Sequence, residues 1–553
     1  MTEASFPIKG VAYTPPSLAK RYYAENQWVP QTVGNMLRRR ATAHPAKAFA
    51  ATDHSTLSYA ELDTRTDILA AALIELGLSP GDRAIFQMGT VVETLIALFA
   101  CYKAGIVPVC TLPQHREIEI GRMINLTQAR VYFVQVDAQP GFDLAAFSLA
   151  MAEAHGNVRY IIAARGRRPS GVHSLEEMAA SLSVERAAAT LASVEISPQD
   201  VLTFQLSGGS TGTPKIIPRF HADYLGQALG IVKRHQFTAS DIAIWPLPLI
   251  HNAAMQLVVL PILLVGGTLV LQRRFDLHEF LTAIERNRVT FAGSIGPIAP
   301  SLLDSHDIAR YDLSSLRMFF ALDRADAIEA CLGVPSTNLY GITEGLLMTC
   351  SPHDAATFRS RVTGYPTSDA DEIHILRPDS EEPVSDGEEG ELCFRGPHML
   401  RGYYNAPDAN RGSFTSNGMF RSEDLVRAEL YEGRTYYTFV GRLKDNISRG
   451  GEKFSAEEVE RLIVQHPAII DVKIVAMPDR LLGEKACAFT IMRAEYKCPT
   501  VKELSAFLSA HGLAKYKHPE HIEVVHEFPL TKVGKVDKAA MRAVIMEKLS
   551  AAG

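Results

Sequence analysis

A segment rich in glycines and hydroxyl side chains at residues 206–219 (LSGGSTGTPKIIPR) is the part of the sequence most suggestive of chemistry. Glycine lets a backbone approach a ligand closely, and backbone N–H groups together with serine and threonine hydroxyls can surround phosphate oxygens. Lys215 adds a cation. The segment is not a Walker A loop, because it lacks G-x-x-x-x-G-K-[ST] and its lysine follows a proline. Composition alone leaves two interpretations, a phosphate-binding loop or a Gly/Ser linker.

Other ionisable residues stand beside glycines or turns: Glu344 in YGITEG, Asp424 in FRSEDL and Lys535 in PLTKVGKVDK. A carboxylate near phosphates suits a hard cation such as Mg²⁺, and a lysine can neutralise charge when one anion attacks another. Taken singly, each is typical of a solvated surface. The pair His251–Asn252 lies between apolar segments and is either a polar turn or a recognition pair. The neutral amide of Asn252 suits a hydroxyl, a ring nitrogen or a carboxylate.

The composition limits the class of protein. The 553 residues are 47% hydrophobic and 21% charged, which excludes bulk disorder. The net charge is 56 − 62 = −6, so global charge gives no reason to expect nucleic acid or membrane binding. The seven cysteines form no C-x-x-C, and the N-terminus MTEASFPIKG has no apolar h-region. The most apolar stretch, 258–270, is too short to span a bilayer and predicts a buried strand and helix edge. We therefore expect a cytoplasmic protein.

The elements that must position these residues alternate between strand-like and helix-like patterns. Helical spacing at 62–76 and 90–104 is interleaved with strand-like runs at 81–88, 106–110 and 158–164, and a helix is expected at about 222–233. Such alternation predicts an α/β fold with largely parallel sheets. Between about 365 and 440, short alternating runs with many glycines predict a small, β-barrel-like unit instead.

A new pattern begins after GRLKDNISRGGEKFS. A helix at about 456–465, strands at DVKIVAMP and KACAFTIM, a helix at 501–511 and a strand at HIEVVHEF form about a hundred residues of α+β structure. We expect residues 1–444 to form a large N-terminal part, with two α/β subdomains and the β unit. We expect residues 445–553 to form a small, mobile C-terminal domain.

Five segments, in order over more than 300 residues, resemble the motifs of the adenylate-forming (ANL) superfamily, which includes acyl-CoA synthetases, nonribosomal adenylation domains and luciferases. They are SGGSTGTPK, YGITEG, FRSEDL, GRLKDNISRGGEKFSAEEVE and PLTKVGKVDK. One such motif would be weak, whereas five in order are specific. The resemblance implies that ATP and an acid give acyl-AMP and pyrophosphate, and that the acyl group then passes to a thiol.

The resemblance also implies an ATP site. Glu344 would hold Mg²⁺ against the phosphates with Thr343 beside it, Tyr340 would stack on adenine, Asp424 would accept bonds from the ribose hydroxyls, and Arg442 would contact ribose and phosphate. The residues expected in the phosphate loop are Ser207, Gly208, Gly209, Ser210, Thr211, Gly212 and Lys215.

Three further roles follow from the resemblance. Lys535 would be the catalytic lysine, because among Lys532, Lys535 and Lys538 it aligns with the motif. Asp445 would be the hinge about which the small domain rotates after adenylate formation. The segment 449–454, with Gly450 and Gly451, would then face the active site for the thioester step.

The acid pocket resembles that of stand-alone aryl-acid ligases of siderophore pathways, which activate 2,3-dihydroxybenzoate or salicylate. The shared segments include His251–Asn252, IPR after the lysine, RGYYNAPDAN and MPDRLLGEKACAF. Amino-acid-activating domains place an aspartate where this chain has Asn252. We therefore expect a role in siderophore or nonribosomal peptide biosynthesis.

The chain departs from that subgroup around the acid. Ala253 replaces the usual aromatic, which predicts a wider or differently shaped pocket. Ala321, Leu322 and Asp323 replace the usual Gly-Gly-[AS], which predicts a narrower wall with an added acceptor. Gly293 and Ser294 would exchange bulk for polarity, and Ser422–Glu423 replaces Thr-Gly before the ribose aspartate. The residues expected at the acid are His251, Asn252, Ala253, Gly293, Ser294, Ala321, Leu322 and Asp323.

We expect an aryl acid other than plain 2,3-dihydroxybenzoate, such as a substituted salicylate or a heteroaromatic acid. The expected acceptor is the phosphopantetheine thiol of a carrier protein acting in trans, and an aryl-CoA ligase that uses CoA is the alternative. A second alternative is a catalytically degenerate homologue that serves as a binding protein. The altered 321–323 and 422–423 segments favour that alternative, and the presence of Lys215, Glu344, Asp424, Arg442 and Lys535 opposes it.

Overall fold

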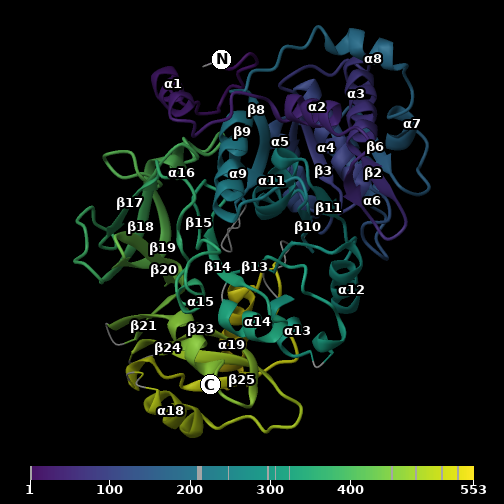
Figure 1. Ribbon diagram of the computed structural model, residues 1–553. Helices are drawn as coiled ribbons and strands as arrows, with labels where there is room; N and C mark the ends of the chain where they lie inside the picture. The colour runs from purple at the N-terminus through teal and green to yellow at the C-terminus, as the bar shows by residue number, and fades with distance from the viewer. Residues whose placement is uncertain are drawn as a thin grey trace.

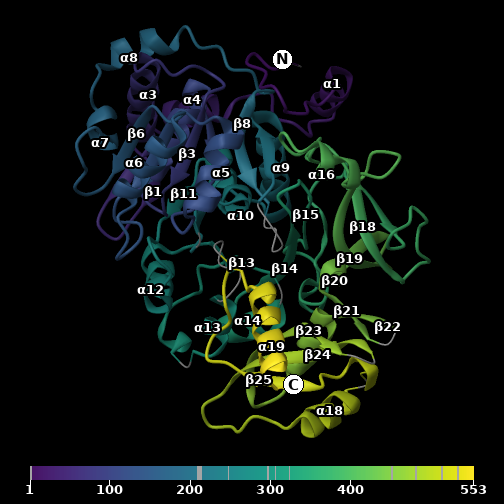
Figure 2. The same ribbon diagram turned by 180° about the vertical axis from the view of Figure 1, so that it is seen from behind.

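The computed structural model forms three β-sheets in its N-terminal part and a fourth in its C-terminal part (Figures 1 and 2). The N-terminal residues lie at the top of Figure 1 and the C-terminal domain at the bottom. The structure describes residues 3–207, 214–246, 248–294, 298–305, 307–322, 324–449, 452–479, 482–511, 513, 515–531 and 535–552.

The first sheet has seven strands in the order β7-β6-β5-β3-β4-β8-β9, parallel except for the antiparallel β8–β9 pair. Its strands are β3 (Arg83–Gln87), β4 (Val107–Val109), β5 (Val131–Gln135), β6 (Tyr160–Ala164), β7 (His173–Ser174), β8 (Val201–Leu206) and β9 (Ile216–Phe220). The helices of this half are α1 (Pro16–Ala24), α2 (Val33–Ala43), α3 (Tyr59–Glu75), α4 (Val92–Ala104), α5 (Glu117–Thr127), α6 (Leu144–His155), α7 (Leu175–Met178), α8 (Val184–Leu191) and α9 (His221–His235).

The second sheet has nine strands in the order β16-β15-β14-β13-β12-β10-β11-β1-β2, with a parallel centre and antiparallel edges. Its strands are β1 (Ala48–Ala51), β2 (Thr56–Ser58), β10 (Ile242–Ile244), β11 (Thr268–Val270), β12 (Phe291–Ser294), β13 (Met318–Ala321), β14 (Ser336–Gly341), β15 (Leu347–Thr349) and β16 (Tyr365–Pro366). The helices that connect them are α10 (Asn252–Ala254), the π-helical turn η1 (Met255–Val259), α11 (Leu260–Val265), α12 (Leu277–Asn287), α13 (Ile298–Leu303), the 3₁₀ turn η2 (Ile308–Arg310), α14 (Ala325–Leu332) and α15 (Ala356–Arg359).

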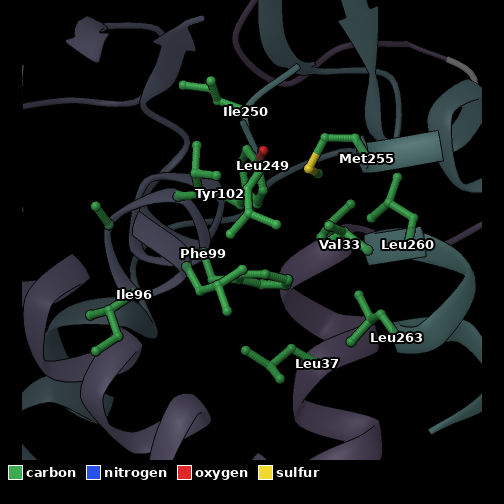
Figure 3. Packing of buried hydrophobic residues seen from close by; sticks show 14 of the residues in the cluster. Val33, Leu37, Ile96, Phe99, Tyr102, Leu249, Ile250, Met255, Leu260 and Leu263 are labelled. Carbon is green, nitrogen blue, oxygen red and sulfur yellow. The ribbon is translucent and has the colours of Figure 1, made fainter. Parts of the chain in front are cut away.

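Helices between these two sheets carry the main apolar core, shown in Figure 3. Val33 of α2 and Phe99 of α4 pack with Met255, Leu260 and Leu263, which come from the η1–α11 segment of the second sheet's connections. Sheets covered on both faces favour near-continuous apolar strands, as in VYFVQ of β5. The core therefore joins the two α/β layers and fixes the η1 turn between them.

The region between 372 and 442 is a four-stranded antiparallel sheet, β17-β18-β19-β20. Its elements are β17 (Glu372–Leu376), β18 (Glu389–Arg395), α16 (Pro407–Gly412), β19 (Phe420–Tyr431) and β20 (Arg434–Arg442). The C-terminal part holds η3 (Leu443–Asp445), β21 (Asn446–Arg449), β22 (Glu452–Ser455), α17 (Ala456–Ile463), β23 (Ile469–Asp479), β24 (Gly483–Met492), α18 (Val501–Ala510), η4 (Lys515–Lys517), β25 (His521–Val524) and α19 (Lys538–Ala552).

The predicted fold class is confirmed: an α/β N-terminal part with a β unit, followed by a small α+β domain. One element next to the glycine-rich loop was not predicted. Strand β9 lies between the glycine-rich loop and helix α9, so the loop closes a β-hairpin and does not lead directly into a helix. Pro218 made this strand hard to predict, and it is tolerated because β9 is an edge strand. Among the described helices, none is long and apolar enough to cross a membrane.

Candidate active site

A cavity of about 440 Å³ lies where the three N-terminal sheets meet the C-terminal domain. Strand ends, helix starts and tight turns supply its wall, as is usual for ligand sites in α/β proteins. The described lining residues are Ser207, Lys215, Gln227, His251, Asn252, Ala253, Gln256, Leu257, Leu322, Leu339, Gly341, Ile342, Thr343, Glu344, Leu346, Leu347, Tyr403, Ser413, Phe420, Arg421, Ser422, Glu423, Asp424, Arg442 and Lys535.

The two ends of the glycine-rich loop reach this cavity. The N–H of Ser207 donates to the carbonyl of Lys215 (2.9 Å), and the N–H of Lys215 donates to Ser207 Oγ (3.0 Å). These two hydrogen bonds hold together the end of β8 and the start of β9. The predicted phosphate contacts at Gly208, Gly209, Ser210, Thr211 and Gly212 lie outside the described residues.

Glu344 stands in a tight turn at the end of β14. Gly345 has φ +123°, and a Cβ there would lie 1.8 Å from the carbonyl oxygen of His398, so only glycine fits this position. The N–H of Leu400 donates to the Glu344 carbonyl (2.7 Å), which ties the turn to the neighbouring chain segment.

A buried arginine supports the same turn from the first sheet. Arg219 of β9 is fully buried, and it donates from Nη1 to the carbonyl of Thr343 (2.9 Å) and pairs through Nε with Asp223 (3.2 Å). Gln227 of α9 donates from Nε2 to the carbonyl of Gly345 (2.8 Å). The backbone on both sides of Glu344 is therefore held by buried donors.

The Glu344 carboxylate also has a side-chain partner. The hydroxyl of Tyr403 donates to Glu344 Oε1 (2.9 Å), and the Lys215 ammonium lies 4.5 Å from the centroid of the Tyr403 ring. Within the described residues no group of three His, Cys, Asp or Glu residues is arranged to hold a metal ion. Mg²⁺ commonly takes one or two carboxylates and completes its shell with phosphates and water, so Glu344 fits as its protein ligand beside a bound triphosphate.

Asp424 and Arg442 face each other across β19 and β20. Arg442 Nε lies 3.3 Å from Asp424 Oδ1, and the hydroxyl of Tyr340 donates to Asp424 Oδ2 (2.7 Å). Burial, followed by the Asp424 charge, raises the pKa of Tyr340 and keeps this donor protonated. Tyr340 is itself buried and is not among the described lining residues, and the next residues along the chain, Gly341 and Ile342, line the cavity.

Glu423, which lines the cavity next to Asp424, has a left-handed backbone with φ +59°. That region suits glycine, which the resemblance leads us to expect at this position. Ser422 preserves the local structure, because its Oγ donates to the Leu392 carbonyl (2.7 Å) and accepts from the Asp424 N–H (3.1 Å). Compared with the expected glycine, Glu423 therefore adds a carboxylate to the cavity wall and a strained backbone. The hydrogen bond from the Asp424 N–H to Ser422 still holds Asp424 in place.

Lys535 reaches the cavity from a turn in the C-terminal domain. Its N–H donates to Thr531 Oγ1 (3.1 Å) and its carbonyl accepts from the Thr531 N–H (2.6 Å). Burial, followed by the charge of Lys535, lowers the pKa of His251 to about 4, so this histidine is neutral at pH 7. Lys538, in contrast, is buried within its own domain against Glu457 and Glu460.

Contacts around the predicted hinge join the two parts of the chain as well as elements of the C-terminal domain. Ser455 Oγ and Arg461 Nη2 of the C-terminal domain donate to the Val440 carbonyl (3.1 and 2.6 Å). Asp445 Oδ1 lies 3.7 Å from Arg542 Nη1 of α19. Arg493 of the C-terminal domain pairs with Asp304 of the N-terminal part (2.9 Å). The predicted thioester-step residues Gly450 and Gly451 lie outside the described residues.

The acid end of the cavity combines apolar side chains with the polar side chains of His251, Asn252 and Gln256. His251 accepts from the Ala253 N–H (3.3 Å) and so caps α10, while Asn252 Oδ1 accepts from the hydroxyl of Tyr224 (2.7 Å). Ala253 and Leu322 contribute to the wall, and Leu322 is the more exposed of the two.

Gly293 does not enlarge the acid pocket, contrary to what the sequence predicted. A Cβ on Gly293 would lie 2.4 Å from Cζ3 of the fully buried Trp245, so the indole fills the space that the glycine leaves and the pocket gains none of it. Gly293 and Ala321 are buried strand residues that are not among the described lining residues. Ser294 is in β12, but its side chain, like the whole of Asp323, lies outside the described residues.

Sequence reasoning missed several lining residues, including Gln227, Gln256 and Tyr403. Tyr403 lies in RGYYN and Arg219 in IPR, segments already similar to the aryl-acid ligases, so their motifs were visible although their contacts were not. Gln227 and Gln256 stand in helical patterns without any motif.

Two family models match the chain: "AMP-binding enzyme" over residues 37–404 and "AMP-binding enzyme C-terminal domain" over residues 458–535. The chain is 36% identical over 551 residues to a 2,3-dihydroxybenzoate-AMP ligase of Bacillus subtilis, covering 98% of this chain and 99% of the relative. It is 33% identical to a salicyl-AMP ligase / salicyl-S-ArCP synthetase of Mycobacterium tuberculosis, covering 97% and 94%.

Among solved structures, the apo structure of MbtA from Mycobacterium smegmatis matches with a TM-score of 0.72 and 31% identity, over 97% of this chain and 98% of that one. The matching models, near full-length relatives and shared fold lead to one conclusion: this chain belongs to the AMP-binding, adenylate-forming enzyme family, alongside the aryl acid–AMP ligases.

Proposed function

We propose that this chain uses ATP to convert an aromatic carboxylic acid to its acyl-AMP, with release of pyrophosphate, and then transfers the acyl group to a thiol. The observation that carries this proposal is the meeting of two unlike regions in one cavity. Lys215, Glu344 and Lys535 line its charged end, and Asn252 and Leu322 line its apolar end.

The first half-reaction needs two anions brought together. An oxygen of the acid's carboxylate attacks the α-phosphorus of ATP, the bond to the β-phosphate oxygen breaks, and pyrophosphate leaves with the electron pair. Lys535 and Lys215 supply positive charge at the cavity wall, which lowers the repulsion and stabilises charge in the transition state. Mg²⁺ held by Glu344 and the phosphates would supply further charge neutralisation.

The nucleotide would be oriented by the β19–β20 pair. Asp424 lines the cavity and is oriented by Arg442 and Tyr340, and its carboxylate is the kind of acceptor that ribose hydroxyls need. We assign the phosphates to Lys215 and the loop it follows, and the adenine to the wall formed by Gly341 and Ile342.

The apolar end supports an aromatic acid. Leucines and Ala253 surround the amide of Asn252, and no described lining residue there offers a carboxylate to pair with an α-ammonium group. The two relatives named above act on 2,3-dihydroxybenzoate and form salicyl-AMP. Because Ala253 and Leu322 change the shape of this end, we propose an acid other than plain 2,3-dihydroxybenzoate.

For the second half-reaction we propose a carrier-protein phosphopantetheine thiol in trans as the acceptor. The thiol attacks the acyl carbon, AMP leaves with the bonding electrons, and the thiol proton passes to solvent. Rotation about Asp445 would bring Gly450 and Gly451 towards the cavity for this step. The name of the mycobacterial relative, which includes a carrier-bound salicyl product, favours a carrier over CoA.

ATP–pyrophosphate exchange measured over a panel of aryl, heteroaryl, fatty and amino acids tests the proposal. Exchange should be strongest with a substituted aryl or heteroaryl acid, and acyl transfer to a holo-carrier protein should exceed transfer to CoA. Strong preference for an amino acid or a fatty acid would overturn the aromatic assignment. Preference for 2,3-dihydroxybenzoate would overturn its finer part, and preferred transfer to CoA would replace the carrier.

A further inference from the structure

A buried glutamine in the cavity wall has no role in the reaction derived so far. Gln256 is 2% exposed and lies in the π-helical turn η1, directly after Met255, which packs into the core shown in Figure 3. π-Helical turns interrupt a helix at some cost and often occur at functional sites. Here the turn holds Gln256 and Leu257 in the wall at the apolar end of the cavity.

The orientation of the Gln256 amide is set by Tyr224. Gln256 Nε2 donates to the Tyr224 carbonyl at 3.4 Å, and because a carbonyl oxygen can only accept, the nitrogen must face it. This leaves Gln256 Oε1 as a buried acceptor with no hydrogen-bond partner in the part of the chain that the structure describes. A buried polar atom without a partner is costly, so a ligand group that donates to it would be favoured.

Tyr224 also sets the orientation of the second amide at this end. Its hydroxyl donates to Asn252 Oδ1, which leaves Asn252 Nδ2 to donate to a ligand. One tyrosine thus orients both amides, so that Asn252 offers a donor and Gln256 an acceptor. The walls around them are apolar, formed by Ala253, Leu257 and others.

We propose that Gln256 is a specificity residue whose Oε1 accepts a hydrogen bond from an O–H or N–H group on the ring of the acid. The substrate would then be an aromatic acid that carries a hydroxyl or amino donor, while Asn252 donates to its carboxylate or to an ortho oxygen. This inference rests on the proposed adenylation of an aromatic acid. It extends that proposal by adding a chemical requirement on the ring.

The test compares pairs of acids in which methylation removes the hydrogen-bond donor, and the Gln256 variant below separates this loss from the added bulk of the methyl groups. ATP–pyrophosphate exchange is measured for the 2-, 3- and 4-hydroxybenzoates and aminobenzoates, each against its O-methyl or N,N-dimethyl analogue. At one ring position at least, the donor-bearing acid should exceed its methylated analogue in kcat/KM by about tenfold or more, since a buried acceptor left unpaired disfavours the analogue. The hydroxyl and amino arms distinguish the two kinds of donor.

Two variants locate the effect. Gln256→Leu, which removes the acceptor, should reduce the donor preference to less than about threefold. The matched control is Gln272→Leu. Gln272 is also buried, its Nε2 donates to a carbonyl (Asp276, 3.0 Å) and its Oε1 also lacks a described partner, but it is not among the described residues of the cavity wall. Using a ratio of two acids cancels partial losses of folded protein.

The outcomes separate the two proposals. Exchange that is equal for donor and methylated acids in the unmodified protein, or a donor preference unchanged in Gln256→Leu, overturns the role of Gln256 and leaves aromatic adenylation intact. Loss of the preference in Gln272→Leu as well would also overturn it, because the effect would then be global. Absence of exchange with every aromatic acid defeats the proposed function itself.

Discussion

The two ends of the cavity differ in how their polar groups are held. At the nucleotide end, Glu344 is held by Tyr403, and Asp424 is held by Tyr340 and Arg442. At the acid end, Gln256 Oε1 lacks a described partner, and among the described residues Asn252 is held only at its oxygen, by Tyr224. At the nucleotide end, the protein itself supplies hydrogen-bond partners for the carboxylates. At the acid end, the amides offer hydrogen-bonding atoms that a ligand must pair.

This difference follows from what each end must recognise. ATP is the same substrate in every turnover, so its contacts can be preorganised by hydrogen bonds within the protein, which lowers the cost of ordering them on binding. The acid must be told apart from similar acids. A buried group that only the correct ring can satisfy discriminates more strongly than apolar contacts do.

The largest effect is expected for Lys535→Ala. Removing the cation from the cavity wall should lower ATP–pyrophosphate exchange at least 100-fold, because charge developing in the transition state loses a preorganised partner. ATP binding, measured by calorimetry, should persist. Lys548→Ala, a surface lysine paired with Glu523, is the control and should keep full activity. Unchanged exchange in Lys535→Ala would remove the mechanism.

The stability of the core between helix α9 and strands β12 and β13 should depend on pH. His235 packs against Phe320 (4.8 Å) with no described hydrogen-bond partner at either ring nitrogen, and burial, followed by nearby Arg234 and Arg317, lowers its pKa from 6.5 to about 3. The unfolded chain therefore binds this proton more tightly. The stability that neutral His235 contributes is fully present above pH 6.5 and is lost as the pH falls towards 3.

His235→Leu should therefore lessen the acid sensitivity. The loss in free energy of unfolding between pH 7 and pH 5, measured by urea titration, should be smaller than in the unmodified chain by about 2 kcal/mol. Part of the loss should remain, because burial also lowers the pKa of His221 and of His398 to about 3. Substituting the exposed His54 by leucine should leave the loss unchanged. An identical loss in His235→Leu would contradict the assignment.

Tyr403→Phe tests the nucleotide end of the cavity. Without the hydroxyl, the Glu344 carboxylate loses a hydrogen bond that helps to orient it, so kcat/KM for ATP at limiting Mg²⁺ should fall about tenfold and recover partly as Mg²⁺ is raised. Tyr404→Phe is the matched control, since its neighbouring ring packs against Phe204 (4.7 Å) in a separate apolar cluster. A similar fall in both variants would point to general disruption of this segment.

The smallest effect is expected for Glu423→Gly. Relief of the left-handed backbone should raise the free energy of unfolding by about 0.5 kcal/mol after the entropy of glycine is counted. Removing a carboxylate from the cavity wall should also lower KM for ATP. Glu432→Gly, at another left-handed position away from the described cavity wall, should give the stability gain alone. If the two variants had the same KM for ATP, the Glu423 carboxylate would have no influence on nucleotide binding.

The amino-acid sequence by itself determined the alternating α/β pattern, the change to short strands after 365 and the C-terminal α+β unit. These features follow from periodicity and turn residues, which act over a few positions. The sequence also supplied Lys215, Glu344, Asp424, Arg442 and Lys535 as candidates, because their motifs are local, and the structure places all of them at one cavity.

Tertiary structure alone decided which side chains touch. Strand β9 was missed because an edge position tolerates a proline that a central strand would not. The space at Gly293 depends on Trp245, and the support of Glu344 depends on Tyr403, 59 residues further along the chain. Gln256 Oε1 has no partner among the described residues because Tyr224 holds the amide by its nitrogen. Such contacts depend on how sheets and helices pack, and the spacing of residues along the sequence does not predict them.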